Sequence, residues 1–394
     1  MAVTTDAIVI GGGVTGTSIA YHLAKAGLRV VLLEKRHLCA GGTGKSTAVV
    51  RMHYENEPET RLAWASFHTY AHFADVIGGD CGFRRTGVLW LVDHAEAEKL
   101  KANVAMHQRL GVNSCVVNPP EVKEIEPACS LARVALGAYE PESGYADPLL
   151  TTFAFARRAQ ELGVDLREGV AVTNVVSSAS RVHGVQTDQE IIEAQLVINA
   201  AGCWAVPLGR MVGLEIPITV QRNQIALFRQ PRELLRRHCV VADIAVGMYF
   251  RPEESRATMV GAGAGEDGVD PDTYNEAVDT DFPSLARYKA SERAPVLKRA
   301  VSQGGWSGIY DMTPDGKAIL GHAGPEGFYL ACGLSGTGFK KAPAIGQCLT
   351  ELITQGQSTT VDLTPFRLSR FAEGQPLRGQ HEYGAGGHFW QTRK

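Results

Sequence analysis

Three glycines near the amino terminus have the spacing of a phosphate-binding turn, Gly11-x-Gly13-x-x-Gly16. In such a turn the first glycine lets the chain bend sharply, and the second lets the backbone approach a pyrophosphate. The third allows a helix to pack tightly on the preceding strand. A helix that begins here would point the free amides of Val14 and Thr15 at the phosphates. The spacing therefore predicts that the chain binds a dinucleotide.

The elements around this turn are those that a dinucleotide site needs. Residues 7–10 are almost wholly apolar, which is typical of a buried parallel strand, and residues 14–26 predict a helix that stops at Gly27. A second apolar strand over 29–33 leads to Glu34, at the distance where a carboxylate accepts a ribose 2′-hydroxyl. Because Glu34 would repel the 2′-phosphate of NADP, the site suits NAD or FAD. The alternative is a glycine-rich turn without a ligand.

Residues 35–46 are rich in glycine, serine and threonine, which predicts a loop with many accessible backbone amides. An NAD dehydrogenase would usually turn directly into another helix here, whereas FAD is longer and needs more contacts. The loop therefore favours FAD, and the alternative is a mobile surface loop. The cofactor contacts predicted in it are Lys35, Gly42, Thr43, Lys45 and Ser46.

A second glycine-rich turn lies between a predicted strand over 327–332 and a predicted helix over 342–352. Its backbone amides and the helix dipole favour partial negative charge, which a reduced flavin carries at its N1–C2=O edge. We therefore expect this turn to contact the flavin through Gly333, Ser335, Gly336, Thr337, Gly338 and Lys340.

The predicted strands are of two kinds. The buried strand over 196–202 returns to the parallel-sheet pattern, whereas 221–228, 248–251 and 258–261 predict antiparallel strands and 83–92 predicts a strand hairpin. We therefore expect an α/β plus α+β fold, with a discontinuous Rossmann-type FAD-binding domain and an antiparallel-sheet substrate domain. The expected boundaries are 1–82, 145–215 and 300–374 for the FAD-binding domain, 83–144 and 216–299 for the substrate domain, and 375–394 for a C-terminal arm at the surface.

Composition narrows the classes of function. The 394 residues carry a formal net charge of −3 and are 44% hydrophobic, so a nucleic-acid-binding surface is not expected. We also expect no secretory signal and no membrane span, because no apolar run is long enough. The eight cysteines are scattered without a Cys-x-x-Cys pair, which predicts reduced thiols, no metal site and a cytoplasmic location.

Five ordered motifs together resemble the D-amino-acid-oxidase-like family of FAD-dependent amine oxidoreductases, within it the group of sarcosine oxidase β-subunits, proline dehydrogenases and glycine oxidases. They extend over nearly the whole chain: the first glycine turn with Glu34, then Gly41-Gly-Thr-Gly-Lys-Ser46, Asn199-Ala-Ala-Gly202, Tyr310-Asp-Met-Thr-Pro-Asp-Gly316 and Gly333-Leu-Ser-Gly-Thr-Gly-Phe-Lys340. The resemblance implies oxidation of a secondary amine or amino acid at the flavin re face. A hydride would pass to flavin N5, and the resulting imine would hydrolyse. It also implies cofactor contacts from Val172, Ala201, Gly202, Trp204 and Gly308.

The resemblance also assigns the substrate site. Arg51 and Lys340 match the arginine and lysine that hold the substrate carboxylate, and Tyr249 resembles a tyrosine near the bound amino acid. His53 joins the site by its place beside Arg51. The alternatives are a solvent-facing Arg51, an inward-pointing Lys341 in place of Lys340, a core role for Tyr249 and a structural His53.

Two departures from the family pattern concern the flavin. Trp306 stands near the position of the cysteine that links FAD in monomeric sarcosine oxidases, and Cys332 is too far along to replace it, so we expect non-covalent FAD. The lysine that speeds reaction with oxygen is missing from the strand over 257–263. Arg251 or His53 could take its place, and the electron acceptor is either O₂ or a quinone-like carrier.

The prediction is thus an enzyme that oxidises an N-alkyl glycine, such as sarcosine or iminodiacetate, or a proline-like amino acid, as a homo- or hetero-oligomer. One alternative is an oxidase of an amine that has no carboxylate. Another is a flavin-bearing assembly protein of the same fold that has lost turnover.

Overall fold

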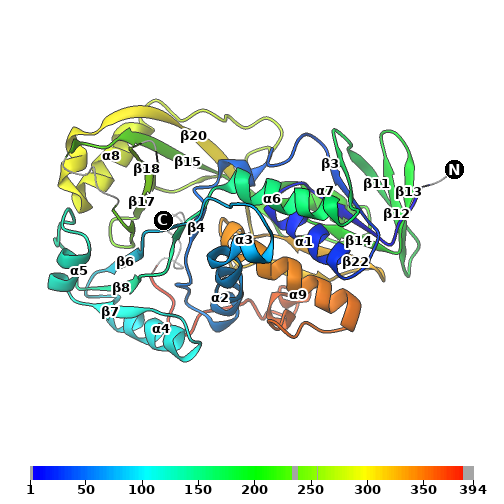
Figure 1. Cartoon of the computed structure of the whole chain (residues 1–394), viewed down its shortest axis with the longest axis horizontal. Helices are drawn as coiled ribbons and strands as arrows, with labels where there is room; N and C mark the ends of the chain where they lie inside the picture. Colours follow the sequence, from blue (N-terminus) through cyan, green and yellow to red (C-terminus); the bar gives the residue numbers. More distant parts are fainter. Residues whose placement is uncertain (1–2, 233–237, 255, 385–394) are drawn as a thin grey trace.

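The computed structural model describes residues 3–232, 238–254 and 256–384. A six-stranded sheet lies at the centre of one half of the molecule (Figure 1). Its first five strands are parallel, and the last pairs antiparallel with its neighbour. Because the parallel strands end at one edge, the loops that follow them meet there. In spatial order the strands are β10 (Asp165–Glu168), β3 (Val30–Glu34), β2 (Ala7–Ile10), β14 (Leu196–Asn199), β22 (Phe328–Cys332) and β21 (Ile319–His322).

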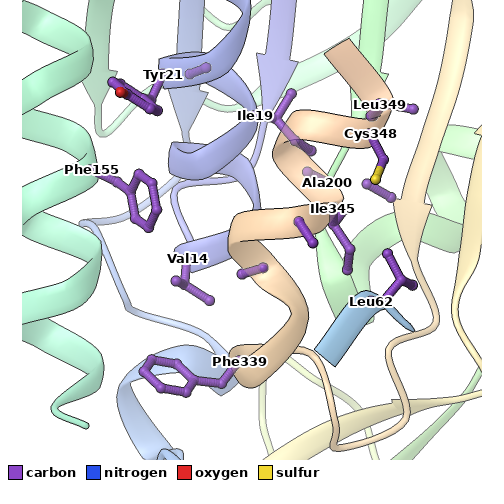
Figure 2. Packing of buried hydrophobic residues seen from close by; sticks show 14 of the residues in the cluster. Val14, Ile19, Tyr21, Leu62, Phe155, Ala200, Phe339, Ile345, Cys348 and Leu349 are labelled. Atoms are coloured by element: carbon purple, nitrogen blue, oxygen red, sulfur yellow. The ribbon is translucent and has the colours of Figure 1, made fainter. Parts of the chain in front are cut away.

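Helices cover one face of this sheet. Helix α1 (Val14–Lys25) lies between α6 (Pro148–Glu161) and α9 (Ala342–Gln355), and the three share one apolar core (Figure 2). Tyr21 of α1 contacts Phe155 of α6, with ring centroids 5.7 Å apart (Figure 2). Helices α2 (Glu57–Ala71) and α3 (Phe73–Val76) extend the same core. This packing fixes the first turn of α1 at the end of β2.

The opposite face of the sheet packs against a second apolar core. This core is shared with a four-stranded sheet and with α7 (Ala205–Arg210). The sheet order is β1 (Val3–Thr4), β13 (Ile191–Glu193), β12 (Val182–Thr187) and β11 (Val172–Ser177). The central sheet is therefore buried on both sides, as its nearly continuous apolar strands predict.

A nine-stranded sheet forms the other half of the molecule. All its strand pairs are antiparallel except β6 with β16, and α8 (Phe282–Arg293) shares an apolar core with it. Helices α4 (Ala97–Arg109) and α5 (Pro119–Ile125) pack near its β7–β8 end. The sheet contains β19 (Glu266–Asp267), β15 (Thr219–Arg229), β18 (Ala257–Ala262), β17 (Met248–Glu253), β16 (Val240–Asp243), β6 (Val88–Val92), β8 (Leu136–Glu140) and β7 (Cys115–Val117), with β20 (Val301–Met312) paired to β15.

The expected hairpin over 83–92 is wrong. The short strand β5 (Arg84–Arg85) pairs with β9 (Gly144–Tyr145), which also pairs with β4 (Val49–Val50), whereas β6 joins the large sheet. The expected boundary at residue 300 separates β20 from its partner β15. Both differences arise from strand pairing between segments far apart in the sequence.

Over residues 375–384, the expected surface arm has exposed side chains at Gln375, Arg378, Gln380 and His381, but the Tyr383 side chain is only 1% exposed. The rest of that arm, 385–394, lies outside the described residues. In the part of the chain that the structure covers, the helices are too short or too polar to cross a membrane.

Candidate active site

A cavity of about 300 Å³ opens at the carboxyl ends of β2, β3 and β14. Its walls come from the phosphate-binding turn, the loop after β3, the segment after β14 and the glycine turn after β22. Fifteen predicted cofactor residues line it, namely Gly11, Gly13, Val14, Thr15, Glu34, Lys35, Gly42, Thr43, Ser46, Val172, Ala201, Gly202, Trp204, Gly336 and Gly338. The structure thus brings segments that are distant in the sequence around one space, as a dinucleotide site requires.

Two glycines of the first turn are required by their surroundings. Gly11 has φ +116°, and a Cβ there would lie 2.5 Å from the carbonyl oxygen of Ala200. A Cβ on Gly16 would collide with the carbonyl oxygen of Gly11, so any side chain would push α1 away from β2. Gly16 therefore serves helix–strand packing and does not line the cavity, in agreement with the usual division of roles in this turn.

The Glu34 carboxylate stands at the end of β3 on the wall of the cavity. It accepts hydrogen bonds from the amide of Gly12 at 2.7 Å and from the amide of Arg36 at 2.8 Å. These two bonds fix the carboxylate where it borders the cavity, which is the position that the predicted bond to a ribose hydroxyl requires.

Asp311 is a cavity residue that the sequence analysis did not assign. It lies on β20, it is 7% exposed, and its Oδ2 has no hydrogen-bond partner among the described residues. Burial raises the pKa of Asp311 to about 6, although neighbouring backbone amides lower it. A buried carboxylate oxygen without a partner fits a cofactor that brings hydroxyl groups, as FAD does. The motif Tyr310–Gly316 contains this residue, but the motif did not indicate that the Asp311 side chain would line the cavity.

Other wall residues were not assigned either, among them Arg36, Gly41, Tyr310 and Phe339. Arg36 lies beside Lys35, and both side chains contact the Trp204 ring, with Lys35 Nζ 4.2 Å from the ring centroid. The composition of the loop after β3 could have indicated Arg36 and Gly41. The two aromatic residues had no comparable signal.

Several predicted cofactor residues lie outside this cavity. Lys45 pairs with Glu276 at 2.7 Å, and Gly308 lies directly against the Lys45 side chain. Ser335 is fully buried and bonds Thr313 and the carbonyl of Gly333, so it braces the turn. The predicted residues that do not line the cavity are Gly16, Lys45, Gly308, Gly333, Ser335, Thr337 and Lys340.

A second cavity of about 60 Å³ adjoins the first and shares Ser46, Tyr310, Gly336 and Phe339 with it. Three of the predicted substrate residues, Arg51, Tyr249 and Lys340, line this small cavity. The rest of its wall is largely apolar, with Val49, Val88, Trp90, Val240 and Ala242. Two cations therefore face an apolar space beside the larger cavity.

The Arg51 guanidinium contacts two aromatic rings. Its central carbon lies 4.6 Å from the Tyr54 ring centroid and 4.7 Å from that of Trp90, and Nη1 donates to the carbonyl oxygen of His53. Arg51 is 9% exposed and has no carboxylate partner among the residues that the structure describes. The alternative of a solvent-facing Arg51 therefore does not hold. A buried guanidinium without an anion is suited to bind one.

Lys340 and Lys341 lie next to each other in the short helix η5 (Phe339–Lys341) and have different neighbours. Lys341 Nζ lies 2.8 Å from Glu59, which Lys317 also approaches at 3.1 Å. Although burial alone would raise the pKa of Glu59, the two lysines hold it well below its usual value. Lys340 lines the small cavity and makes no ion pair in the described part of the chain.

The charge of Lys340 is poorly compensated. Burial, followed by the charges of Arg51 and Lys341, lowers the pKa of Lys340 well below its usual value. An anion in the small cavity would lie beside both cations and raise that pKa again. The arrangement thus favours a carboxylate ligand.

Tyr249 lies on β17 at the wall of the small cavity, with its hydroxyl 3.2 Å from that of Thr47. Its ring covers Gly261 of β18, where a Cβ would collide with it. His53 does not reach either cavity. Its ring stacks on Trp90 with centroids 4.9 Å apart, and Nε2 lies 2.8 Å from the Tyr383 hydroxyl.

Neither proposed substitute for the missing lysine faces the cavities. Arg251 is 3% exposed, pairs with Glu253 at 3.0 Å and lies over the Tyr145 ring. His53 is separated from the small cavity by Trp90.

One group of buried residues could be considered for a metal. Single atoms of His53, His107 and Glu140 all lie within 4.8 Å of one another. A metal bonded at about 2.1 Å would need such atoms about 3.4 Å apart. A water molecule with hydrogen bonds of about 2.9 Å needs a spread of about 4.7 Å, which matches better. The absence of a metal site stays a prediction.

Comparison with known proteins relates this geometry to a family. The sequence model of the family described as FAD dependent oxidoreductase (DAO) matches residues 6–352. The sarcosine oxidase β subunit of Rhodobacter capsulatus is 29% identical over 94% of this chain and 89% of that protein. Mitochondrial dimethylglycine dehydrogenase of Rattus norvegicus is 28% identical over 96% of this chain, which spans 47% of that protein's length. The structure of L-proline dehydrogenase from P. horikoshii has a TM-score of 0.88 and 29% identity, covering 96% of this chain and 100% of that one.

Proposed function

Because the chain belongs to the DAO family of FAD-dependent oxidoreductases, we propose that it oxidises a small secondary amine that carries a carboxylate. Its substrate is an N-alkyl glycine, such as sarcosine or iminodiacetate, or a proline-like amino acid. The names of its relatives, which include sarcosine oxidase and dimethylglycine dehydrogenase, and the L-proline dehydrogenase structure support this class of substrate.

The main support for a substrate with a carboxylate is the position of two cationic side chains. Arg51 and Lys340 line the same small cavity, without an anionic partner among the described residues, and that cavity shares four wall residues with the dinucleotide cavity. A carboxylate placed between the two cations would satisfy both of them. The remainder of the substrate would then extend along the apolar wall toward the shared residues, where the two cavities meet.

The side chains of this chain orient the substrate and exclude water. The planar Arg51 fork can bind both oxygens of a carboxylate, and Lys340 adds a second charge. Val49, Val88, Val240 and Ala242 form a wall for the N-alkyl group. When bound, FAD supplies the redox chemistry by accepting a hydride at N5 from the carbon beside the amine, which leaves an imine for water to hydrolyse. The binding energy of the carboxylate thus serves to align that carbon.

The cofactor is proposed to be held without a covalent bond. Trp306 lies on β20 with its indole N–H bonded to the carbonyl oxygen of Lys45 at 2.9 Å, and Cys332 is fully buried. Cys203 is the cysteine that lines the large cavity among the described residues. Burial raises the pKa of Cys203 well above its usual value, so it is a thiol and a poor nucleophile.

The proposal also covers the location of the enzyme, its oligomeric state and its electron acceptor. Its eight cysteines are all free thiols, which supports a cytoplasmic location. The word subunit in the names of the sarcosine oxidase relatives supports a hetero-oligomer, with a homo-oligomer as the alternative. The electron acceptor is a quinone-like carrier or O₂.

The test is anaerobic reduction of the bound flavin by a panel of amines. Sarcosine, proline, iminodiacetate, N,N-dimethylglycine and D-amino acids should include at least one compound that bleaches it. Simple alkylamines without a carboxylate are tested beside this panel, and if only they bleach the flavin, the proposed substrate class is wrong. If none of them does so while dithionite does, the assembly-protein alternative is supported.

A further inference from the structure

Tyr383, His53 and Trp90 form one cluster of rings next to Arg51 and the small cavity. The Tyr383 ring stacks on His53 at 5.9 Å with an interplanar angle of 14°, and His53 stacks on Trp90 at 4.9 Å and 22°. The rings of Tyr383 and Trp90 also contact each other directly, with centroids 6.4 Å apart and an interplanar angle of 31°. Trp90 in turn contacts Arg51, whose guanidinium carbon lies 4.7 Å from the Trp90 ring centroid and 4.6 Å from that of Tyr54. The cluster thus connects Tyr383 to the proposed carboxylate-binding group.

Hydrogen bonds attach the chain around Tyr383 to the rest of the fold. The Tyr383 amide donates to Glu55 at 3.0 Å, and the next amide, of Gly384, donates to Glu96 at 2.9 Å. Asn103 of α4 donates to the carbonyl oxygen of His381 at 3.1 Å. One contact from Glu55 and two from α4 and its N-cap residue therefore fix the backbone that carries the Tyr383 ring.

The His53 imidazole depends on Tyr383 for its orientation. Its Nε2 lies 2.8 Å from the Tyr383 hydroxyl, while its Nδ1 has no hydrogen-bond partner among the described residues. The stacking contacts alone allow the ring to slide in its plane, whereas the hydrogen bond fixes it. The same residue also supplies, through its carbonyl oxygen, the acceptor for Arg51 Nη1.

We propose that Tyr383 is a positioning residue for Arg51, and that it acts through His53 and Trp90 to hold the guanidinium in the plane that a substrate carboxylate needs. This inference rests on the proposed function, because it requires that Arg51 binds a carboxylate. Two parallel hydrogen bonds from a guanidinium form only when its plane matches that of the carboxylate. Fixing the plane in advance lowers the entropy that binding must overcome.

A general structural role for Tyr383 would give a different result. A large buried ring whose loss simply loosens the fold would weaken the binding of every ligand and of FAD alike. A positioning role affects only ligands that use Arg51, so the selectivity between a carboxylate and its neutral analogue is the quantity to measure.

The test uses the full-length, FAD-loaded protein and two probes that cannot be oxidised in the same way, pyrrole-2-carboxylate and pyrrole-2-carboxamide. Their Kd values are measured from the change in the flavin absorption spectrum. Tyr383→Phe, which loses only the hydroxyl, should raise the Kd of the carboxylate about three- to tenfold. Tyr383→Ala should raise it further, and the Kd of the carboxamide should stay within about twofold in both variants. Tyr288→Phe, at a 63% exposed tyrosine, is the matched control and should change neither value.

The outcomes distinguish the positioning role of Tyr383 from the proposed function of the protein. An unchanged carboxylate Kd in the Tyr383→Phe variant, or an equal loss for both probes, would overturn the positioning role while leaving the proposed function intact. A wild-type protein that binds the carboxylate no better than the carboxamide would overturn both. If Tyr383→Ala fails to fold, the Kd values of Tyr383→Phe alone still test the positioning role.

Discussion

The Lys341 amine lies 2.8 Å from the Glu59 carboxylate in the interior of the protein, and this pairing assigns the two adjacent lysines different roles. Lys341 neutralises a buried acid, whereas Lys340 lines the small cavity and makes no ion pair among the described residues. Under the proposed function, the first of these neighbours serves stability and the second serves substrate binding.

Replacing the two lysines one at a time should separate these roles. Lys341→Met leaves Glu59 with Lys317 alone and should lower the free energy of unfolding by on the order of 3 kcal/mol. Lys340→Met removes a buried unpaired cation, so stability should be unchanged or higher while the substrate KM rises. Urea unfolding of the two variants measures the first quantity, and steady-state kinetics measure the second. Equal destabilisation by both changes would contradict the assignment.

Removal of the Arg51 charge should affect substrate and not cofactor. Arg51→Met should lower kcat/KM by one to three powers of ten, about 2–4 kcal/mol for a lost buried charge pair. Arg51→Lys should recover only part of this loss, because an ammonium cannot reproduce the planar fork. The FAD content per protein, measured after acid precipitation, should equal that of the wild type. Unchanged kinetics would place the substrate carboxylate elsewhere.

Asp311 should make the stability of the FAD-free protein depend on pH. Its raised pKa, about 6 against about 3.9 in an unfolded chain, means that the folded state binds the proton more tightly. Its favourable contribution is therefore complete below about pH 4 and is lost as the pH rises through about 6.

Asp311→Asn should thus become more stable relative to the wild type as the pH rises from 4.5 to 7.5, by on the order of 2–3 kcal/mol in urea unfolding of the FAD-free proteins. The same variant should bind FAD more weakly, because the amide replaces a charged acceptor in the cavity. A stability difference that is the same at every pH would show that Asp311 is ionised throughout.

Reaction of the reduced enzyme with oxygen should be slow. A cation beside the flavin favours the first electron transfer, because superoxide is an anion. Arg51 and Lys340 are proposed to be neutralised by the carboxylate of the bound ligand. The Tyr249 ring occupies the place of a side chain at Gly261, and Arg251 pairs with Glu253 and lines neither cavity. We therefore expect faster re-oxidation by a soluble quinone than by air-saturated buffer in stopped-flow mixing. Re-oxidation by O₂ at the rate of turnover, with stoichiometric hydrogen peroxide, would identify an oxidase.

Local sequence patterns were sufficient to predict the glycine turns and the acidic residue that border the large cavity. The turn at Gly11–Gly16, the carboxylate of Glu34 and the second glycine turn each depend on neighbours within a few residues. The parallel strands that carry them then bring the loops to the same edge of the sheet. The family membership and the FAD-binding fold predicted from these motifs are confirmed by the match over residues 6–352 and by the similarity to solved structures.

Contacts between distant segments could not be predicted in this way. The choice between Lys340 and Lys341 is set by Glu59, 282 residues before Lys341. Tyr383 in the expected arm is buried because it bonds His53 and Glu55. These two residues lie far from it in the sequence. Likewise β5 and β6 separate because β9 and β16 offer them different partners. No local pattern contains that information.

The central claim is that the small cavity binds a substrate carboxylate beside the flavin. The most direct measurement is anaerobic stopped-flow reduction of the flavin by the best amino acid of the panel and by its carboxamide, which differs only in the missing charge. We predict that the second-order rate constant of reduction is at least about a hundredfold higher for the acid, which corresponds to about 3 kcal/mol. Equal rate constants for the acid and the amide would contradict the account.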